Sequence, residues 1–290
     1  MESGLLTNLL LPLALGVIML GLGLGLTVDD FRRVARFPRA VLVGLGLQVL
    51  VLPWAALGLA IAFRLPPELA VGLMLLAASP GGATANIYSH LARGDVALNI
   101  TLTAINSLRC LATLPVIVDL SLGFFLGEGQ YVPPPFAKVI EVAAIILLPV
   151  GIGMVARALA PGFAAWAEKP IRVLSVLVLV ALIIAAVLQA GDALVGYFAA
   201  VGIACLLFNL VSMGTGYLVP RALKLPPRQA IAIAMEIGIH NGTLAIFIAL
   251  NVLGSAAMSV PAAVYSLLMF FTAGGFAWWL VRRGPVAGVA

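Results

Sequence analysis

Apolar stretches long enough to cross a membrane recur along this chain from one end to the other. A membrane-spanning helix needs about 20 consecutive, mainly apolar residues. Hydrophobic residues make up 63% of the sequence and charged residues only 9%, a balance that excludes a soluble domain. We therefore predict an all-α integral membrane protein with about nine transmembrane helices. The expected spans are 5–27, 39–63, 68–93, 95–121, 134–158, 171–190, 194–220, 227–254 and 260–281.

The lysines and arginines fall mainly in every second connection between these spans. Thirteen of the sixteen basic residues lie on one side of the predicted membrane. Cytoplasmic loops of membrane proteins are enriched in Lys and Arg, so we expect the N-terminus outside and the C-terminus in the cytoplasm. The two cysteines, Cys110 and Cys205, lie in apolar runs and have no spacing that suggests a disulfide framework or a metal site.

Two similar segments enter the predicted membrane from opposite sides. RLPPELAVGLMLLAASPGG begins the third span and KLPPRQAIAIAMEIGIHNG begins the eighth, with their Leu-Pro-Pro triplets 160 residues apart. Each runs into a polar, glycine-bearing interruption, at 80–86 and 236–243. A simple kink explains one copy alone, but broken helices at matching positions of two inverted halves indicate the binding site of a transporter. In hydrocarbon such breaks persist only where protein buries them or where they line a wet cavity.

The second interruption places a carboxylate and an imidazole inside an apolar helix. A charge at the bilayer centre costs at least about 2.5–3.5 kcal/mol, and Glu236 has no evident Lys or Arg at its depth. Its possible partners are a proton, His240 one turn along the helix, or a bound cation. Other polar residues expected within the spans are Gln48, Asn86, Asn99, Thr103, Asn106 and Ser107. Such hard oxygen ligands suit an alkali cation and are a poor set for a transition metal.

The strings SPGGATANIYSHLARGDVALNITLT and EIGIHNGTLA resemble the bile acid:sodium symporter family, which includes bacterial homologues of the intestinal and hepatic bile acid transporters. The resemblance covers nearly the whole chain. It implies one membrane transporter unit over residues 1–290, located in the inner (plasma) membrane, with a core domain whose two broken helices cross near mid-membrane, and a panel domain. The implied boundaries are about 39–122 and 194–283 for the core, with broken helices at 68–93 and 227–254, and about 5–27 and 134–190 for the panel.

The same resemblance implies two sodium sites behind the crossing of the broken helices. The first site would consist of Asn86, Asn99, Thr103 and Glu236. The second would consist of Gln48 and His240 with the backbone around Glu236, Ile237 and Ile239. The expected substrate-binding residues are Ala83, Thr84, Asn241 and Gly242. For Asn241, helix capping is the alternative role.

Some residues depart from the family pattern. Ala85 stands where many members have Ser, which removes a hydroxyl ligand, and Asn99 stands where Ser is common. His240 replaces a Gln; a neutral imidazole can bind sodium less well than an amide oxygen, and a protonated one would repel it. We therefore hypothesise that protonation of His240 competes with one cation. Arg109 is also unexpected, and pairing with Asp119, an outward orientation and anion binding are its alternatives.

Together these features predict a secondary active transporter. One or two sodium ions would hold the broken helices in place, and sodium running inward would drive uptake of an organic anion by alternating access. The resemblance implies a bile acid-like substrate or a small carboxylate such as pantoate. A proton-coupled carrier, or an efflux carrier or channel of the same superfamily, is the alternative. An enzyme would need a nucleophile or third ligand beside Glu236 and His240, so we expect no enzyme, no cofactor besides Na+ as coupling ion, and no nucleic-acid partner.

Overall fold

The computed structural model describes residues 11–127, 136–190 and 193–282, and this part of the chain is helical apart from short turns and one isolated bridge. The prediction of an all-α fold is confirmed for these residues. The first half contains α2 (Leu11–Gly25), α3 (Val28–Arg32), η2 (Arg33–Ala35), α4 (Pro38–Gly46), η3 (Leu47–Val51), α5 (Leu52–Ala62), α6 (Pro67–Ala78), α7 (Ala85–Leu91) and α8 (Val96–Leu126). The second half contains α9 (Phe136–Leu159), α10 (Pro161–Ala190), α11 (Ala193–Ala222), α12 (Pro227–Gly238), α13 (Gly242–Phe247), η4 (Ile248–Val252) and α14 (Ala256–Arg282).

Several of these helices are long and apolar enough to cross a membrane. Four meet this criterion among the described residues, and a fifth span results if the two arms of a 72° bend, Pro12–Gly25 and Val28–Ala35, are counted as one. The four are Pro38–Ala62, Val96–Leu126, Phe198–Ala222 and Ala256–Arg282. The chain is therefore a multi-pass membrane protein, and the total of nine spans stays a prediction.

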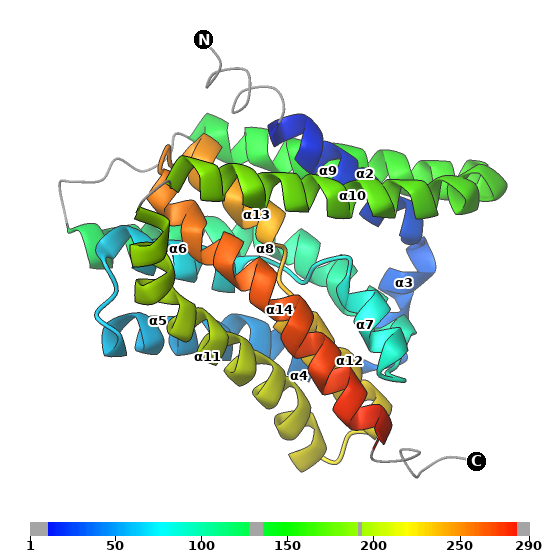
Figure 1. The fold of residues 1–290 in the computed structure, drawn as a ribbon. Coiled ribbons are helices and arrows are strands. Elements are labelled where there is room, and N and C mark those ends of the chain that lie inside the picture. The colour runs from blue at the N-terminus through cyan, green and yellow to red at the C-terminus, as the bar shows by residue number, and fades with distance from the viewer. Residues whose placement is uncertain (1–10, 128–135, 191–192, 283–290) are drawn as a thin grey trace.

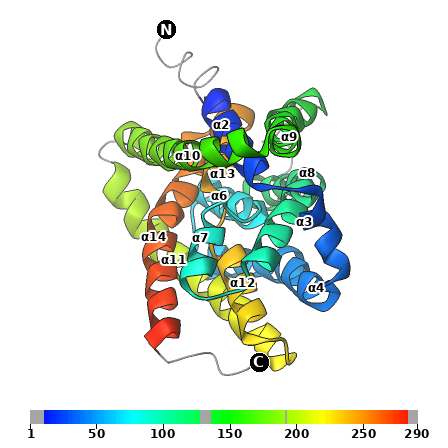
Figure 2. The same cartoon turned by 90° about the vertical axis from the view of Figure 1, so that its right-hand side faces the viewer.

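The long helices form two groups, which are visible from two directions 90° apart (Figure 1, Figure 2). In the smaller group, α2, α9 and α10 pack on one another along one side of the molecule. There α2 and α9 approach backbone to backbone, because a Cβ added at Gly23 would lie 2.2 Å from the carbonyl oxygen of Val150. Glycine permits such close helix contacts within membranes. Residues 5–10 and 134–135 of the predicted panel, and 283 of the predicted core, lie outside the described residues.

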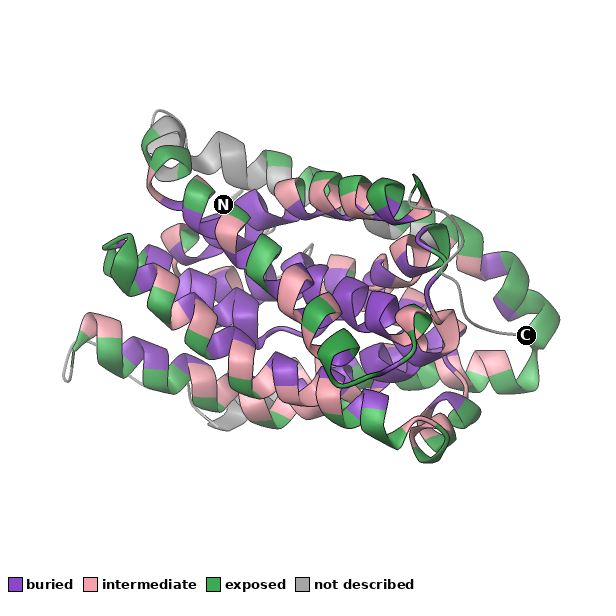
Figure 3. Ribbon diagram, turned by 90° about the horizontal axis from the view of Figure 1, so that it is seen from below, coloured by how far each residue is buried: buried purple, intermediate pink, exposed green. Residues whose placement is uncertain are grey.

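The two helices that follow the Leu-Pro-Pro triplets form the most enclosed part of the fold. Every residue of α6 from Leu69 to Ala78, and every residue of α12 from Ala230 to Gly238, is buried. Figure 3 shows this burial on the inner helices, with exposed residues on the outer faces. An apolar helix in a membrane can face lipid, but the burial of these residues shows that other helices surround both α6 and α12. The larger group consists of the remaining long helices. The two interruptions that follow α6 and α12 therefore begin at its centre.

The sequence repeat is also a repeat of local structure. Pro66 and Pro226 precede α6 and α12 with nearly the same backbone angles, φ −50° and ψ 141° in the first, φ −53° and ψ 143° in the second. Two residues earlier, Arg64 and Lys224 both have positive φ, 48° and 60°. Proline suits the first helical turn because its φ is fixed near the helical value and its missing N–H would have no partner there. The triplet thus starts a helix in the same way in both halves.

The helix that contains the sixth predicted span begins before that span. The sequence predicts a basic connection between spans that end at 158 and begin at 171, but α10 begins at Pro161 and only Ala160 separates it from α9. Proline occupies the first helical position, where it is well tolerated, and the charged residues after it stay helical. With 30 residues, α10 is about 45 Å long, which exceeds the roughly 30 Å of a bilayer's hydrocarbon core.

Candidate functional site

The two interruptions lie against each other and form backbone hydrogen bonds. The chain between α6 and α7 runs antiparallel to the chain between α12 and α13 at an isolated bridge. Gly82 N donates to Ile239 O at 2.7 Å, and Asn241 N donates to Pro80 O at 2.8 Å. In a membrane interior, irregular backbone needs partners of this kind. Each break therefore satisfies polar groups of the other, as expected for interruptions that meet.

The Glu236 side chain is fully buried beside the opposite interruption. Thr103 Oγ1 donates to its Oε2 at 2.5 Å, and Asn106 Nδ2 donates to its Oε1 at 3.0 Å. The backbone N–H of Gly81 donates to the same carboxylate. A Cβ added at Gly81 would lie 2.3 Å from Glu236 Oε1, so only glycine leaves room for the carboxylate at this position.

The remaining members of the first predicted sodium site present buried oxygens without partners. Asn99 donates through Nδ2 to the carbonyl of Ala232 at 2.7 Å, while its Oδ1 is buried without a hydrogen bond in the described part of the chain. Asn86 Oδ1 is also buried and has no hydrogen-bond partner among the described residues. Leaving a buried acceptor unsatisfied costs about 1–3 kcal/mol, so such oxygens in a native structure call for an explanation.

The second predicted set meets at the end of α6. Gln48 Nε2 donates to Ser79 O at 2.9 Å, and His240 Nδ1 lies 3.3 Å from the same carbonyl. This contact assigns the proton to Nδ1 and leaves Nε2 with a free lone pair. Gln48 Oε1 and His240 Nε2 are both buried without a partner among the described residues. Ile237 and Ile239 are fully buried as well, and Ile239 O already accepts from Gly82 N.

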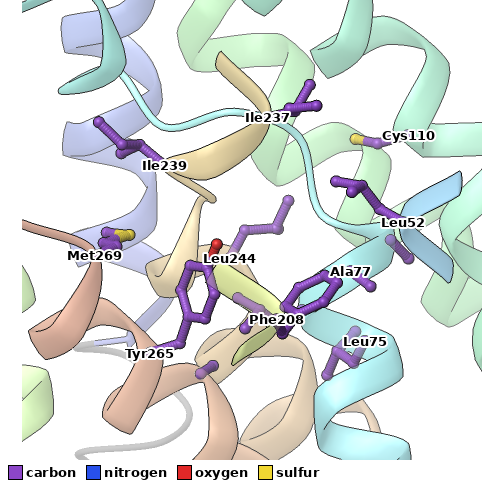
Figure 4. Packing of buried hydrophobic residues seen from close by; sticks show 14 of the residues in the cluster. Leu52, Leu75, Ala77, Cys110, Phe208, Ile237, Ile239, Leu244, Tyr265 and Met269 are labelled. Carbon is purple, nitrogen blue, oxygen red and sulfur yellow. The ribbon is translucent and has the colours of Figure 1, made fainter. Parts of the chain in front are cut away.

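The His240 ring is held by two aromatic residues from neighbouring helices. It stacks on Phe208, with ring centroids 5.6 Å apart, and meets Tyr265 edge-on at 5.4 Å. Figure 4 shows Phe208 and Tyr265 within the buried apolar packing around the breaks. Asn209 Nδ2 and Tyr265 Oη both donate to the carbonyl of Gly238 at 2.9 Å. Asn209 thus links α11 to the end of α12, as amide side chains commonly do between helices in membranes.

The structure also brings in residues whose roles the sequence did not indicate. Arg109 Nη2 donates to Asn106 Oδ1 at 2.8 Å, and Asn106 in turn reaches Glu236. The expectation that Glu236 has no arginine at its depth is therefore wrong, because Arg109 is one amide away. Pairing of Arg109 with Asp119 is not observed among the described ion pairs. Ser79, whose carbonyl joins the second set, had no signal in the sequence.

A cavity of about 390 Å³ lies between the breaks and the group formed by α2, α9 and α10. It is bordered by Ile18 and Leu22 of α2 and by Glu168 of α10. All four residues predicted to bind substrate line it: Ala83, Thr84, Asn241 and Gly242. Asn241 also caps α13, with its Oδ1 accepting from Leu244 N at 3.0 Å. The capping alternative is therefore confirmed, and contact with substrate stays a prediction.

Comparison with known proteins gives consistent matches. Residues 12–197 match the model of the Sodium Bile acid symporter family. An uncharacterized sodium-dependent transporter YocS of Bacillus subtilis is 31% identical over 253 residues, which cover 87% of this chain and 77% of that protein. A probable sodium/metabolite cotransporter BASS1, chloroplastic, of Arabidopsis thaliana is 28% identical over 273 residues, which cover 87% of this chain and 62% of that protein. The P3 protein of Mus musculus is 29% identical over 238 residues, which cover 82% of this chain and 50% of that protein. The chain thus spans under two thirds of the last two proteins.

Proposed function

The chain belongs to the sodium bile acid symporter family, and from this premise we propose that it couples sodium to the transport of an organic anion. It is a membrane transporter, not an enzyme. The observation that carries the finer proposal is the full burial of Glu236 against the break of the opposite repeat, together with buried oxygens of Asn86 and Asn99 that have no hydrogen-bond partner among the described residues. A buried carboxylate needs charge compensation, and a small cation surrounded by oxygens provides it.

We assign the two predicted sodium sites to the two sets of residues around the breaks. The first uses the Glu236 carboxylate, the Thr103 hydroxyl and the free oxygens of Asn86 and Asn99. The second uses Gln48 and His240, with backbone around residues 236–239. Oxygen ligands of this kind suit a hard cation. Ions bound there would stabilise the paired breaks, which border the cavity, and would thereby couple ion binding to substrate binding.

The position of the cavity supports alternating access. Its wall combines residues of the breaks with Leu26, His90 and Glu168, which lie near helix ends that the charge distribution places on the cytoplasmic side. We infer that the structure is open toward the cytoplasm. The helix from Gly242 to Val252 begins at the cavity, and the positive end of its dipole favours an anionic group. A bile acid-like compound or a small carboxylate such as pantoate is the proposed substrate.

The proposed architecture has nine spans in the plasma membrane, with the N-terminus outside and the C-terminus in the cytoplasm. The panel, at about 5–27 and 134–190, corresponds to α2, α9 and α10, which pack as one group (Figure 1). The core, at about 39–122 and 194–283, contains both broken helices. The matching geometry at Pro66 and Pro226 supports an inverted repeat. Movement of one group against the other would open and close the cavity between them.

Uptake into proteoliposomes tests the proposed function. We expect a radiolabelled bile acid or pantoate to accumulate above its outside concentration only when sodium is imposed as an inward gradient. A channel would only equilibrate the label, and a proton-coupled carrier would respond to an imposed proton gradient instead. Ion and substrate binding must be reciprocal, so sodium should also increase the thermal stabilisation by the transported anion. Accumulation of the labelled anion to the same level with and without a sodium gradient would rule out the proposal.

The role of His240 gives a separate prediction. His240→Gln is expected to strengthen sodium binding about threefold or more and to flatten its pH dependence, because an amide oxygen binds sodium better than an imidazole and takes up no proton at these pH values. Sodium titrations of the melting temperature at a series of pH values, from acidic to mildly alkaline, measure both effects. The same substitution at His90, which borders the cavity but belongs to neither proposed ion site, shows how much a histidine elsewhere contributes to the pH profile. An unchanged pH profile in His240→Gln would exclude competition between a proton and the ion.

A further inference from the structure

We propose that Arg109 is a built-in counter-charge for Glu236, which acts through Asn106 and lowers the sodium affinity of the first site. This inference rests on the proposed function and concerns a residue to which the sodium-binding sets assign no role. Arg109 touches neither the cavity nor the carboxylate in any described contact. It is therefore a positioning residue, whose effect reaches the ion site through a single amide.

Two hydrogen bonds connect the guanidinium to the carboxylate. Arg109 Nη2 donates to Asn106 Oδ1 at 2.8 Å, and Asn106 Nδ2 donates to Glu236 Oε1 at 3.0 Å. The side chains of Thr103, Asn106 and Arg109 follow one another at intervals of three along α8, a spacing that places them on one helix face. Asn106 is fully buried, so water does not compete for its amide.

The guanidinium fixes the orientation of the Asn106 amide. Arginine has only donors, and it therefore binds the oxygen end of the amide and turns the NH2 end toward Glu236. In this orientation Asn106 donates to the carboxylate and offers no oxygen to a cation there. The oxygens left for an ion at Glu236 are those of Asn86, Asn99 and Thr103. Loss of Arg109 would release the Asn106 oxygen as an additional ligand.

The charge of Arg109 is not neutralised elsewhere in the described part of the chain. Its Nε and Nη1 atoms are buried without hydrogen-bond partners, and no ion pair among the described residues includes it. Arginine stays protonated in proteins, and in a medium of low dielectric constant its field extends over several ångströms with little screening. Glu236 thus has partial compensation before any ion arrives, and an incoming sodium ion meets a like charge nearby.

Sodium titrations of thermal stability in detergent test this inference, at mildly alkaline pH where protons compete least for a carboxylate. We expect Arg109→Gln to lower the sodium midpoint by about tenfold, because both the like charge and the constraint on Asn106 are removed. Arg109→Lys keeps the charge, so its midpoint should stay within about twofold of wild type. Arg39→Gln, which removes an exposed guanidinium that bonds to Leu223 O, is the control and should change nothing.

The outcomes separate the inference from the function on which it rests. A wild-type protein without any sodium response contradicts the proposed function. A normal wild-type response with an unchanged or raised midpoint in Arg109→Gln overturns the inference alone. A shift in Arg109→Lys as large as that in Arg109→Gln also overturns it, since charge would not be the cause. If Arg109→Gln does not fold, Arg109→Met, which keeps the apolar stem, is subject to the same criteria.

Discussion

Replacing Glu236 with glutamine is expected to weaken sodium binding at the first site severely and to abolish sodium-driven uptake, while the protein still folds. Glutamine has nearly the same shape and can still accept from Thr103 Oγ1, which lies 2.5 Å from the carboxylate. It lacks the negative charge that attracts an ion into a buried site. Even with an effective dielectric constant near 20, a contact between opposite charges is worth several kcal/mol, so we expect the sodium midpoint to rise by about 100-fold or more.

The matched control for this variant is Glu68→Gln, in the first turn of α6. Glu68 is exposed and accepts from Ser255 Oγ at 3.4 Å, so its replacement removes one negative charge without touching the breaks. Sodium titrations and proteoliposome uptake are compared for the two variants. If Glu236→Gln keeps the wild-type sodium midpoint, the ion does not bind at this carboxylate, and the first sodium site as assigned here is incorrect.

Gly81→Ala is expected to weaken sodium binding from the opposite side of the same contact. The new Cβ would lie 2.3 Å from Glu236 Oε1, so the carboxylate has to leave its position between Thr103 and Asn106. Forcing one extra carbon into a packed interior typically costs about 1–3 kcal/mol. We therefore expect a lower melting temperature together with a sodium midpoint raised by about tenfold or more, which corresponds to about 1.4 kcal/mol.

Gly123→Ala serves as the control for this prediction. Gly123 lies in α8, and a Cβ added there meets no atom within 4 Å. Alanine replaces glycine in a helix with a gain of up to about 1 kcal/mol, so this variant should melt at or above the wild-type temperature with an unchanged response to sodium. A Gly81→Ala protein that responds to sodium like Gly123→Ala would show that the contact between the two breaks does not shape the ion site.

The sequence predicted that the two breaks meet, but it did not predict which of their polar atoms form hydrogen bonds. The Leu-Pro-Pro repeat and the polar interruptions could be found by inspection because they are local patterns, and the two segments do pair through Gly82 and Asn241. Which oxygens remain free could not be inferred. That depends on how helices from different parts of the chain are rotated against one another, as with Asn99, whose amide nitrogen is occupied by Ala232 O.

Arg109 shows a signal that was present and misinterpreted. Its partner Asn106 lies three residues earlier on the same helix, the closest spacing at which side chains meet on a helical face. Asp119, ten residues further along α8, has the opposite charge but forms no ion pair with Arg109 among the described residues. In a buried polar stripe, an amide that relays a hydrogen bond is an equally good partner.

The two main-chain bonds between the interruptions also restrict how the molecule can move. Separating Gly82 from Ile239, or Asn241 from Pro80, would break main-chain hydrogen bonds inside the membrane-spanning fold, where irregular backbone depends on such partners. The two halves of the repeat are therefore joined by hydrogen bonds at their helix interruptions. Any motion that keeps these hydrogen bonds must move the two broken helices together as one rigid body.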